Sequence, residues 1–262
     1  MPITPDQVDA YRRDGCLVDV PALSPAEVTR LLNQLQSTVQ AAEAAPGGWV
    51  DRHYFPHEEE EHPLLDWFLE LATHPAVLDN VAALLGDDLL VRNGDIFLKT
   101  GARSERVRWH QDTRRDEVDG MVSAWIALTD VTPTNSPLEL VLGSYTQSFE
   151  LEGGSSLAIA ASELPRVEAM PRVANTMKAG RMSLHHLRTV HRSEASEGDF
   201  RAAFVVRYMA ADTSAKAAEA GQGMLVRGRR HGTAFGLTST FPVTWISGDR
   251  TGAAGNARFA VM

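Results

Sequence analysis

The segment Trp109-His110-Gln111-Asp112 contains two side chains that could bind the same metal ion. Alternate side chains of an extended strand point to one face, so His110 and Asp112 would offer an imidazole and a carboxylate together. A further histidine is available in the stretch Leu184–Ser193. Two histidines and one carboxylate, with coordination positions left open, are the ligands typical of non-haem Fe(II) oxygenases.

Charged and polar residues near these candidates could bind a co-substrate. Arg201 opens the predicted strand that follows His191, and its guanidinium could bind one carboxylate of a dicarboxylate through two hydrogen bonds. Ser193 has the same strand parity as His191 and could donate to that carboxylate, and Lys99, at a strand end, could bind it too. The alternative is that Arg201 and Lys99 are strand-end charges in water.

The elements that would position these residues change in type along the chain. Capping residues and apolar spacing predict helices over Thr4–Gly15, Ser24–Ala45 and Leu64–Leu85, the last broken at His74-Pro75. Alternating or continuous apolar runs then predict strands. These are Cys16–Val20, Leu89–Asn93, Asp95–Lys99, Val122–Leu128, Leu138–Leu142, Met182–Leu187 and Ala202–Tyr208, with weaker candidates at Ser148–Leu157 and Arg172–Met177.

Helices followed by a run of short strands predict a mainly β fold with flanking helices and a jelly-roll, cupin-like core. We expect one domain over residues 1–262, because no linker-like stretch divides the sequence. Within it, residues 1–86 form a mostly helical cap, 87–210 the jelly-roll core and 211–262 a C-terminal extension.

Composition excludes several classes of function. The 262 residues are 44% hydrophobic, and the net charge of −9 argues against nucleic-acid binding, which depends on neutralising phosphates. The single cysteine, Cys16, fits a reducing compartment. We find no signal peptide and no apolar run near the roughly 18 residues that a membrane helix needs. We therefore expect a cytoplasmic protein with a small-molecule substrate, as a monomer or a homodimer.

In these features the chain resembles the phytanoyl-CoA dioxygenase (PhyH) family of Fe(II)- and 2-oxoglutarate-dependent oxygenases. The order and spacing of the matching segments carry the resemblance. They are Thr4–Val20, Gly86, Asp95–Lys99, Trp109–Thr113, Ser123–Asp130, Leu142–Ser144, His191–Ser193 with Arg201, and Leu225–Gly228. Two residues depart from the family pattern: Tyr145 replaces the usual His after Gly-Ser, and Arg192, which could narrow the site entrance, replaces the usual Gly.

The resemblance implies a double-stranded β-helix that binds Fe(II) through His110, Asp112 and His191. Arg201 and Ser193 would bind the distal carboxylate of 2-oxoglutarate. Lys99 and Trp125 would also lie near this co-substrate, O2 would be the oxidant, and ascorbate would support activity as a reductant.

Three histidines compete for the position of the distal ligand. Only His191 is followed by serine two residues later and by Arg201, so we favour it over His185 and His186. On an unbroken strand His185 would share a face with His191. His185 or His186 would then contact the metal ligands or the substrate, with His186 the candidate substrate residue, or the two are a packed histidine pair.

The resemblance also implies a reaction. Halogenating relatives replace the carboxylate ligand by a small residue, so the presence of Asp112 favours hydroxylation of an unactivated C–H bond with release of succinate and CO2. Desaturation, epimerisation or cyclisation with the same cofactors is the alternative, and a non-catalytic cupin-like binding protein is a third. The ligand set does not distinguish the first two.

The substrate is expected to be a small polar or anionic metabolite or a natural-product intermediate. Arginines flank the His110 segment in an otherwise acidic chain, and Arg114 and Arg115 are the candidates for holding an anion. Arg106 and Arg108 share strand parity with His110. The alternative is a solvated face in which these arginines pair with neighbouring acidic residues.

Overall fold

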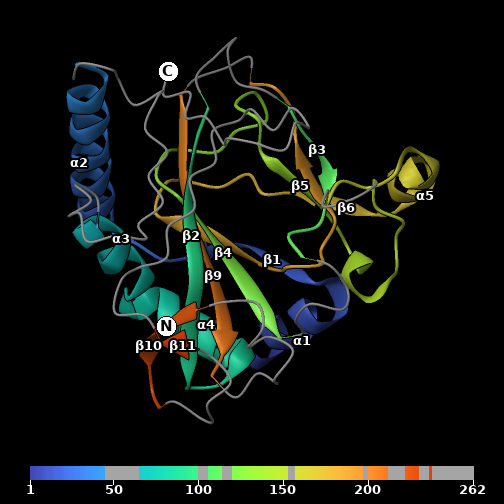
Figure 1. Ribbon diagram of the computed structural model, residues 1–262, viewed down its shortest axis with the longest axis horizontal. Coiled ribbons are helices and arrows are strands. Elements are labelled where there is room, and N and C mark those ends of the chain that lie inside the picture. Colours follow the sequence, from blue (N-terminus) through green and yellow to red (C-terminus); the bar gives the residue numbers. More distant parts are fainter. Residues whose placement is uncertain are drawn as a thin grey trace.

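Two sheets, antiparallel except for the parallel pair at the β11 edge, face each other in the computed structural model (Figure 1). The structure describes residues 1–44, 65–99, 106–113, 120–152, 157–196, 200–211, 222–229 and 236–237. The larger sheet has the strand order β1-β7-β4-β9-β2-β10-β11, and the smaller has the order β3-β8-β5-β6. The larger sheet contains β1 (Cys16–Pro21), β2 (Leu89–Lys99), β4 (Met121–Ala127), β7 (Arg181–His186), β9 (Arg201–Ala210), β10 (Gln222–Arg227) and β11 (Gly236–Leu237). The smaller sheet contains β3 (Val107–His110), β5 (Leu138–Val141), β6 (Arg172–Ala174) and β8 (His191–Ser193).

Among the described residues, four α-helices form within the ranges that the sequence predicts, and a fifth was not predicted. They are α1 (Pro5–Asp14), α2 (Pro25–Ala44), α3 (Leu65–Ala72), α4 (Pro75–Leu85) and the unpredicted α5 (Leu164–Ala169). Thr4 caps α1 through a reciprocal pair of hydrogen bonds with Gln7, and Ser24 and Glu27 make the same pair before α2. The predicted break at His74-Pro75 is confirmed, because α3 and α4 are separate helices.

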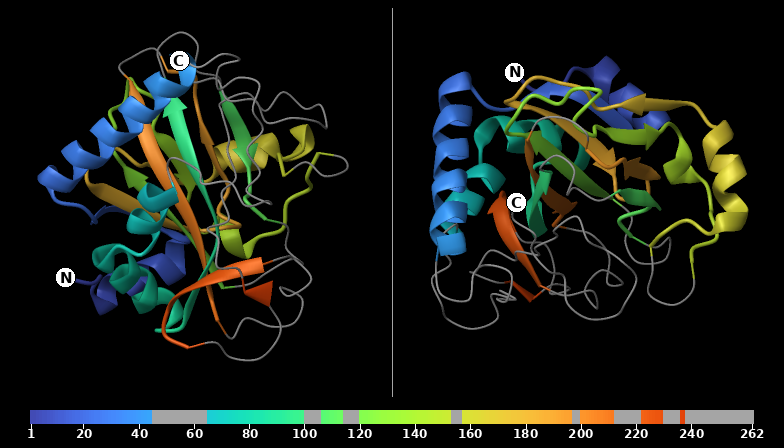
Figure 2. Two further views of the ribbon diagram at one scale, coloured as in Figure 1. Left: turned by 60° about the vertical axis from the view of Figure 1, so that its left-hand side comes forward. Right: turned by 90° about the horizontal axis from the view of Figure 1, so that it is seen from above.

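The helices α2, α3 and α4 cover one face of the larger sheet, and the smaller sheet lies on its other side (Figures 1 and 2). Side-chain alternation in the central strands explains both contacts. Ala124 of β4 lies beside Leu184 of β7 and Val206 of β9, and this row packs in the helix-covered core. The next row, with Trp125 and Val205, packs against the smaller sheet.

Several strand predictions need correction. The run 89–99 forms one strand with a register shift between Val91 and Asn93, because a bulge absorbs the irregularity instead of a turn. The weak candidate Ser148–Leu157 shows only the isolated bridge of Leu151 to Ile159 among its described residues. The strand β1 pairs with β7, and β10 pairs with β2, so strands from all three predicted segments of the chain join one sheet.

A positive φ at Gly15 ends α1 and brings the chain toward the functional candidates. Gly15 adopts φ 78°, and its N–H bonds back to Tyr11. A Cβ there would lie 2.5 Å from the ring of Tyr145, so glycine is required on steric grounds as well. Its carbonyl accepts from His186 N–H and from Thr189 Oγ1, which fixes the turn between β7 and β8. None of the helices described is both long and apolar enough to cross a membrane.

Candidate metal centre and co-substrate site

His110, Asp112 and His191 come together between the two sheets. One ligand atom from each lies within 4.8 Å of the others, and this is the only such cluster of His, Cys, Asp and Glu in the described part of the chain. The two histidines are direct partners on the antiparallel strands β3 and β8. Nε2 of His110 lies 3.8 Å and Nε2 of His191 lies 3.9 Å from Oδ1 of Asp112.

Strand alternation does not explain the position of Asp112, because this residue lies beyond the end of the strand. The strand β3 ends at His110, and Asp112 follows in a bend. Its N–H donates to Leu187 O at 2.7 Å, while the Gln111 side chain donates to Arg188 O at 2.6 Å. The turn after β7 therefore holds the carboxylate opposite the two imidazoles.

Backbone hydrogen bonds orient both imidazoles. Nδ1 of His110 lies 2.9 Å from Arg108 O, and Nδ1 of His191 lies 2.9 Å from Thr189 O. A carbonyl can only accept, so each Nδ1 carries the proton and each Nε2 keeps its lone pair for a metal. The donor set and its tautomers thus fit a divalent transition metal.

The protonation states fit as well. Burial works against the charged form of Asp112, but Arg207 and the three nearby histidines outweigh it and hold its pKa well below the usual range. Burial, together with His110, lowers the pKa of His191 well below its usual value. At neutral pH the site therefore offers an ionised carboxylate and neutral His191, the forms that bind metals.

Arg207 is a buried residue that sequence reasoning missed. Its guanidinium pairs with Asp95 of β2 and lies 3.4 Å from Oδ1 of Asp112. Burial opposes the charge, but the two carboxylates outweigh it and raise the pKa of Arg207. A signal was present, since Arg207 shares parity with Arg201 along a strand that is otherwise apolar after Arg201.

A second group of predicted residues comes together where β2 and β9 meet. Lys99 and Arg201 are direct partners on these strands, and both are buried. The guanidinium of Arg201 lies 5.3 Å from the ring centroid of Trp125. Nη1 of Arg201 donates to Ser136 O, while Nζ of Lys99 donates to Ser136 Oγ at 2.9 Å and to Glu194 O at 2.5 Å. Ser136 was not predicted.

These two cations form a site suited to an anion. Burial and the nearby charge of Arg201 lower the pKa of Lys99 to about 7, and burial lowers the pKa of Arg201 to about 9. Nε of Arg201 is buried and has no hydrogen-bond acceptor among the residues the structure describes. Ser136, at the same place, has a positive φ of 68°, a strained conformation for a residue with a side chain. A carboxylate bound here would accept a hydrogen bond from Arg201 and offset part of the buried positive charge.

The other predicted site residues fall in different places. Ser193 is buried on β8 and pairs with Val107 of β3 and Leu138 of β5. His186 lies on the opposite face of β7 from His185, beside Val122 and against the ring of Tyr145 at 4.8 Å. Its Nδ1 accepts from Arg188 N–H at 3.0 Å. His186 therefore does not share the metal-facing side of β7 with His185, and its role as a substrate contact stays a prediction.

Arg114 and Arg115 lie outside the described residues. Of the arginines around them, Arg106 pairs with Glu194 at 3.3 Å and Arg108 with Glu152 at 2.9 Å, both with exposed side chains. A register shift between Val107 and His110 breaks the alternation on which the shared parity was based.

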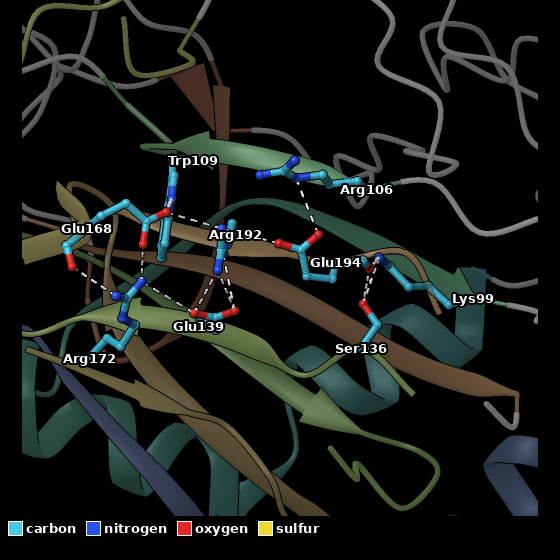
Figure 3. A network of polar contacts seen from close by, with 9 residues as sticks. All are labelled: Lys99, Arg106, Trp109, Ser136, Glu139, Glu168, Arg172, Arg192 and Glu194. Carbon is cyan, nitrogen blue, oxygen red and sulfur yellow. Dashed lines mark hydrogen bonds and ion pairs between the residues drawn. The ribbon is translucent and has the colours of Figure 1, made fainter. Parts of the chain in front are cut away.

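Arg192 follows His191 on β8, so its side chain points to the opposite face of that strand. Its guanidinium stacks over Trp109 at 4.5 Å and pairs with Glu139 at 3.0 Å (Figure 3). Both Trp109 and Arg192 adjoin a candidate ligand in the sequence, so the side chains that alternate with the ligands form a polar network on the outer face of the smaller sheet.

Two opposed sheets with a His-Asp-His cluster between them are typical of the jelly-roll oxygenases that use non-haem iron. Residues 11–203 match the phytanoyl-CoA dioxygenase (PhyH) family. The chain belongs to this family, as the resemblance in its sequence predicted.

Individual relatives agree with this assignment. The ectoine dioxygenase of Bordetella bronchiseptica is 30% identical over 165 residues, which are 58% of this chain and 52% of that protein. The ectoine dioxygenase of Streptomyces avermitilis is 28% identical over 197 residues, covering 66% of this chain and 65% of that protein. The chain thus spans about half to two thirds of the length of these curated relatives.

Solved structures cover more of the chain. A non-heme monooxygenase, ThoJ, matches with a TM-score of 0.70 and 29% identity, covering 90% of this chain and 88% of that chain. The alpha ketoglutarate dependent carbocyclase SnoK from nogalamycin biosynthesis matches with a TM-score of 0.64 and 29% identity, covering 81% and 86%. The predicted mainly β, jelly-roll fold is confirmed.

Proposed function

We propose that the protein is an Fe(II)- and 2-oxoglutarate-dependent dioxygenase that hydroxylates an unactivated C–H bond of a small metabolite, with release of succinate and CO2. The observation that carries the proposal is the convergence of His110, Asp112 and His191 to within 4.8 Å, with both Nε2 atoms directed to one carboxylate oxygen. The buried cations Lys99 and Arg201 supply the second requirement, a site for a dicarboxylate.

Bound iron would supply oxygen activation and the oxidative decarboxylation of 2-oxoglutarate. The protein would contribute positioning. His110, Asp112 and His191 would hold the metal. Arg201 would bind the distal carboxylate of 2-oxoglutarate with its free Nε, and Lys99 would add a second charge beside it.

Trp125 and Ser193 support the co-substrate in this proposal. The ring of Trp125 lies over the Arg201 guanidinium, a cation–π contact that limits the orientations of the fork. Ser193 is two residues from His191 on the short strand β8, which links the metal candidates to the region of Glu194 and Lys99. The substrate class, a small polar or anionic metabolite or a natural-product intermediate, and the support of activity by ascorbate remain predictions from the sequence.

A different outcome with the same cofactors is the second candidate. Its support is the 29% identity to an alpha ketoglutarate dependent carbocyclase. Desaturation, epimerisation and cyclisation would use the same ligands and the same co-substrate site. Product analysis separates them from hydroxylation, because only hydroxylation adds one oxygen from O2 to the product.

The test is succinate formation by the purified protein under air with Fe(II), 2-oxoglutarate and ascorbate. Slow, iron-dependent succinate release, lost in Asp112→Ala and Arg201→Met, supports the oxygenase. Ectoine is a reasonable first substrate to add, since curated relatives act on it by name. A protein that binds 2-oxoglutarate without iron-dependent turnover would favour the non-catalytic binding protein.

A further inference from the structure

Polar side chains from neighbouring strands of the larger sheet converge on Asp112. Ser123 of β4 is the direct cross-strand partner of Arg207 on β9 and of His185 on β7. The three side chains therefore form a row across the centre of the sheet, on the face that looks toward the smaller sheet. All three are buried.

The row contacts mainly one of the two carboxylate oxygens. Ser123 Oγ donates to Oδ2 at 3.1 Å, and Nε of Arg207 donates to Oδ2 at 3.4 Å. Nε2 of His185 lies 3.8 Å from the same oxygen. Oδ1 instead faces Nε2 of His110 and His191, with Nη2 of Arg207 at 3.4 Å.

Burial explains why Ser123 and Arg207 must bond to the carboxylate of Asp112. A hydroxyl and a guanidinium in a sheet interior cost free energy unless they are bonded. Arg207 is anchored on its far side by Asp95 and on its near side by Asp112. Ser123 has no exposed surface, and Asp112 is the acceptor of its hydroxyl. Both residues are therefore placed so that the orientation of Asp112 is fixed.

We propose that Ser123 and Arg207 are positioning residues that hold Oδ2 of Asp112 on the protein side and present Oδ1 to the metal. This inference rests on the proposed function. A carboxylate held in this way binds through one oxygen, and the positions that it does not occupy stay available for a co-substrate and O2. Neither residue is expected to contact the metal.

Metal binding by purified protein tests the proposal without any substrate. Co(II) is titrated into the metal-free protein under anaerobic conditions, with its visible absorption as the signal of the ligand arrangement. Ser123→Ala is compared with Ser183→Ala. Ser183 is an equally buried serine of β7, in the row of Trp125, whose Oγ has no hydrogen-bond partner among the described residues. Thermal unfolding of each metal-free variant checks the fold.

We expect Ser123→Ala to bind Co(II) about 10-fold more weakly, with an altered absorption spectrum, because partners of a metal ligand typically contribute about 10- to 100-fold to affinity. Ser183→Ala should match the wild type. Arg207→Lys keeps the positive charge beside Asp95 but loses the branched guanidinium, so it should also alter the spectrum. If Ser123→Ala does not fold, this variant tests the positioning of Asp112.

Two results would overturn the proposal in distinguishable ways. If Ser123→Ala and Arg207→Lys share the affinity and spectrum of the wild type, Asp112 needs no positioning and the proposed function stands. If wild type and Asp112→Ala bind Co(II) equally, there is no metal site at Asp112, and both proposals fail.

Discussion

Two groups of charged residues lie on opposite sides of the smaller sheet, and the inner group includes the candidate ligand Asp112. The inner cluster, between the sheets, consists of Asp95, Arg207 and Asp112. The outer network contains Glu139, Glu168, Arg172 and Arg192 around the ring of Trp109 (Figure 3). The exposed fraction of the side chains is at most 11% in the inner cluster but 15–43% in the outer network.

This difference in burial separates two uses of similar ion pairs. Inside, water cannot compensate a charge, so each group must have a partner or a ligand, and a lost partner is costly. Outside, water screens the charges, and each pair contributes little by itself. The inner cluster is therefore suited to holding a metal ligand in place. The outer network connects β3 and β8 on the face away from the larger sheet.

The largest expected effect breaks the inner cluster. Asp95→Asn removes the main partner of Arg207, which should lower the free energy of unfolding by about 3–5 kcal/mol. Glu139→Gln, the matched change in the outer network, should cost about 0–1 kcal/mol. Urea unfolding of both variants measures the difference. Equal losses would show that burial does not separate the two groups.

The next effect concerns the co-substrate. Arg201→Met removes charge-assisted hydrogen bonds of about 1.5–3 kcal/mol, so affinity for 2-oxoglutarate should fall roughly 10- to 150-fold. Arg192→Met removes the same charge from the outer network and should leave that affinity unchanged. Calorimetric titration with 2-oxoglutarate in the presence of Co(II) measures both. A comparable loss of affinity in Arg192→Met would contradict a co-substrate site between the two sheets.

A smaller effect depends on pH. Burial and the charge of Arg201 lower the pKa of Lys99 to about 7, so the amine loses its charge as the pH rises through this value. Affinity for 2-oxoglutarate should then decline by up to about tenfold between about pH 6 and pH 8. Lys99→Met should bind more weakly at the lower pH and show a flatter dependence. An unchanged slope in this variant would remove Lys99 from the co-substrate site.

The smallest effect tests the outer network itself. Arg192→Met removes the stacking over Trp109 and the pairs with Glu139 and Glu168, which should reduce stability by about 0.5–1 kcal/mol. Co(II) affinity should stay within about twofold of the wild type. A large loss of Co(II) affinity would mean that the network sets the distance between the two histidines, and the comparison would have to be revised.

The fold class and most of the residues that cluster in the site could be predicted from the sequence. The backbone path that brings these residues together could not. Local rules were sufficient for α1 and α2, whose capping residues adjoin them in the sequence. The His110–Asp112 pair was also predicted, but from strand alternation, whereas Asp112 lies beyond the strand. Its position depends on Leu187, 75 residues away in the sequence, and no local rule contains such a contact.

Residues that support the site were harder to predict. Ser123 and Arg207 acquire their roles only from the register of β4, β7 and β9, which one sequence does not specify. His185 and His186 show the same limit. Strand alternation separates their faces, but only the assembled sheet shows that His185 is the one beside Asp112.

We expect the metal candidates and the buried cations Lys99 and Arg201 to bind the same molecule of 2-oxoglutarate. The most direct measurement is the weak visible metal-to-ligand charge-transfer band that forms when 2-oxoglutarate binds Fe(II) without oxygen. We expect this band in the wild type, its loss in Asp112→Ala and a higher 2-oxoglutarate requirement in Arg201→Met. A wild-type protein that binds both Fe(II) and 2-oxoglutarate without the band would contradict the claim, because the two would then occupy separate sites.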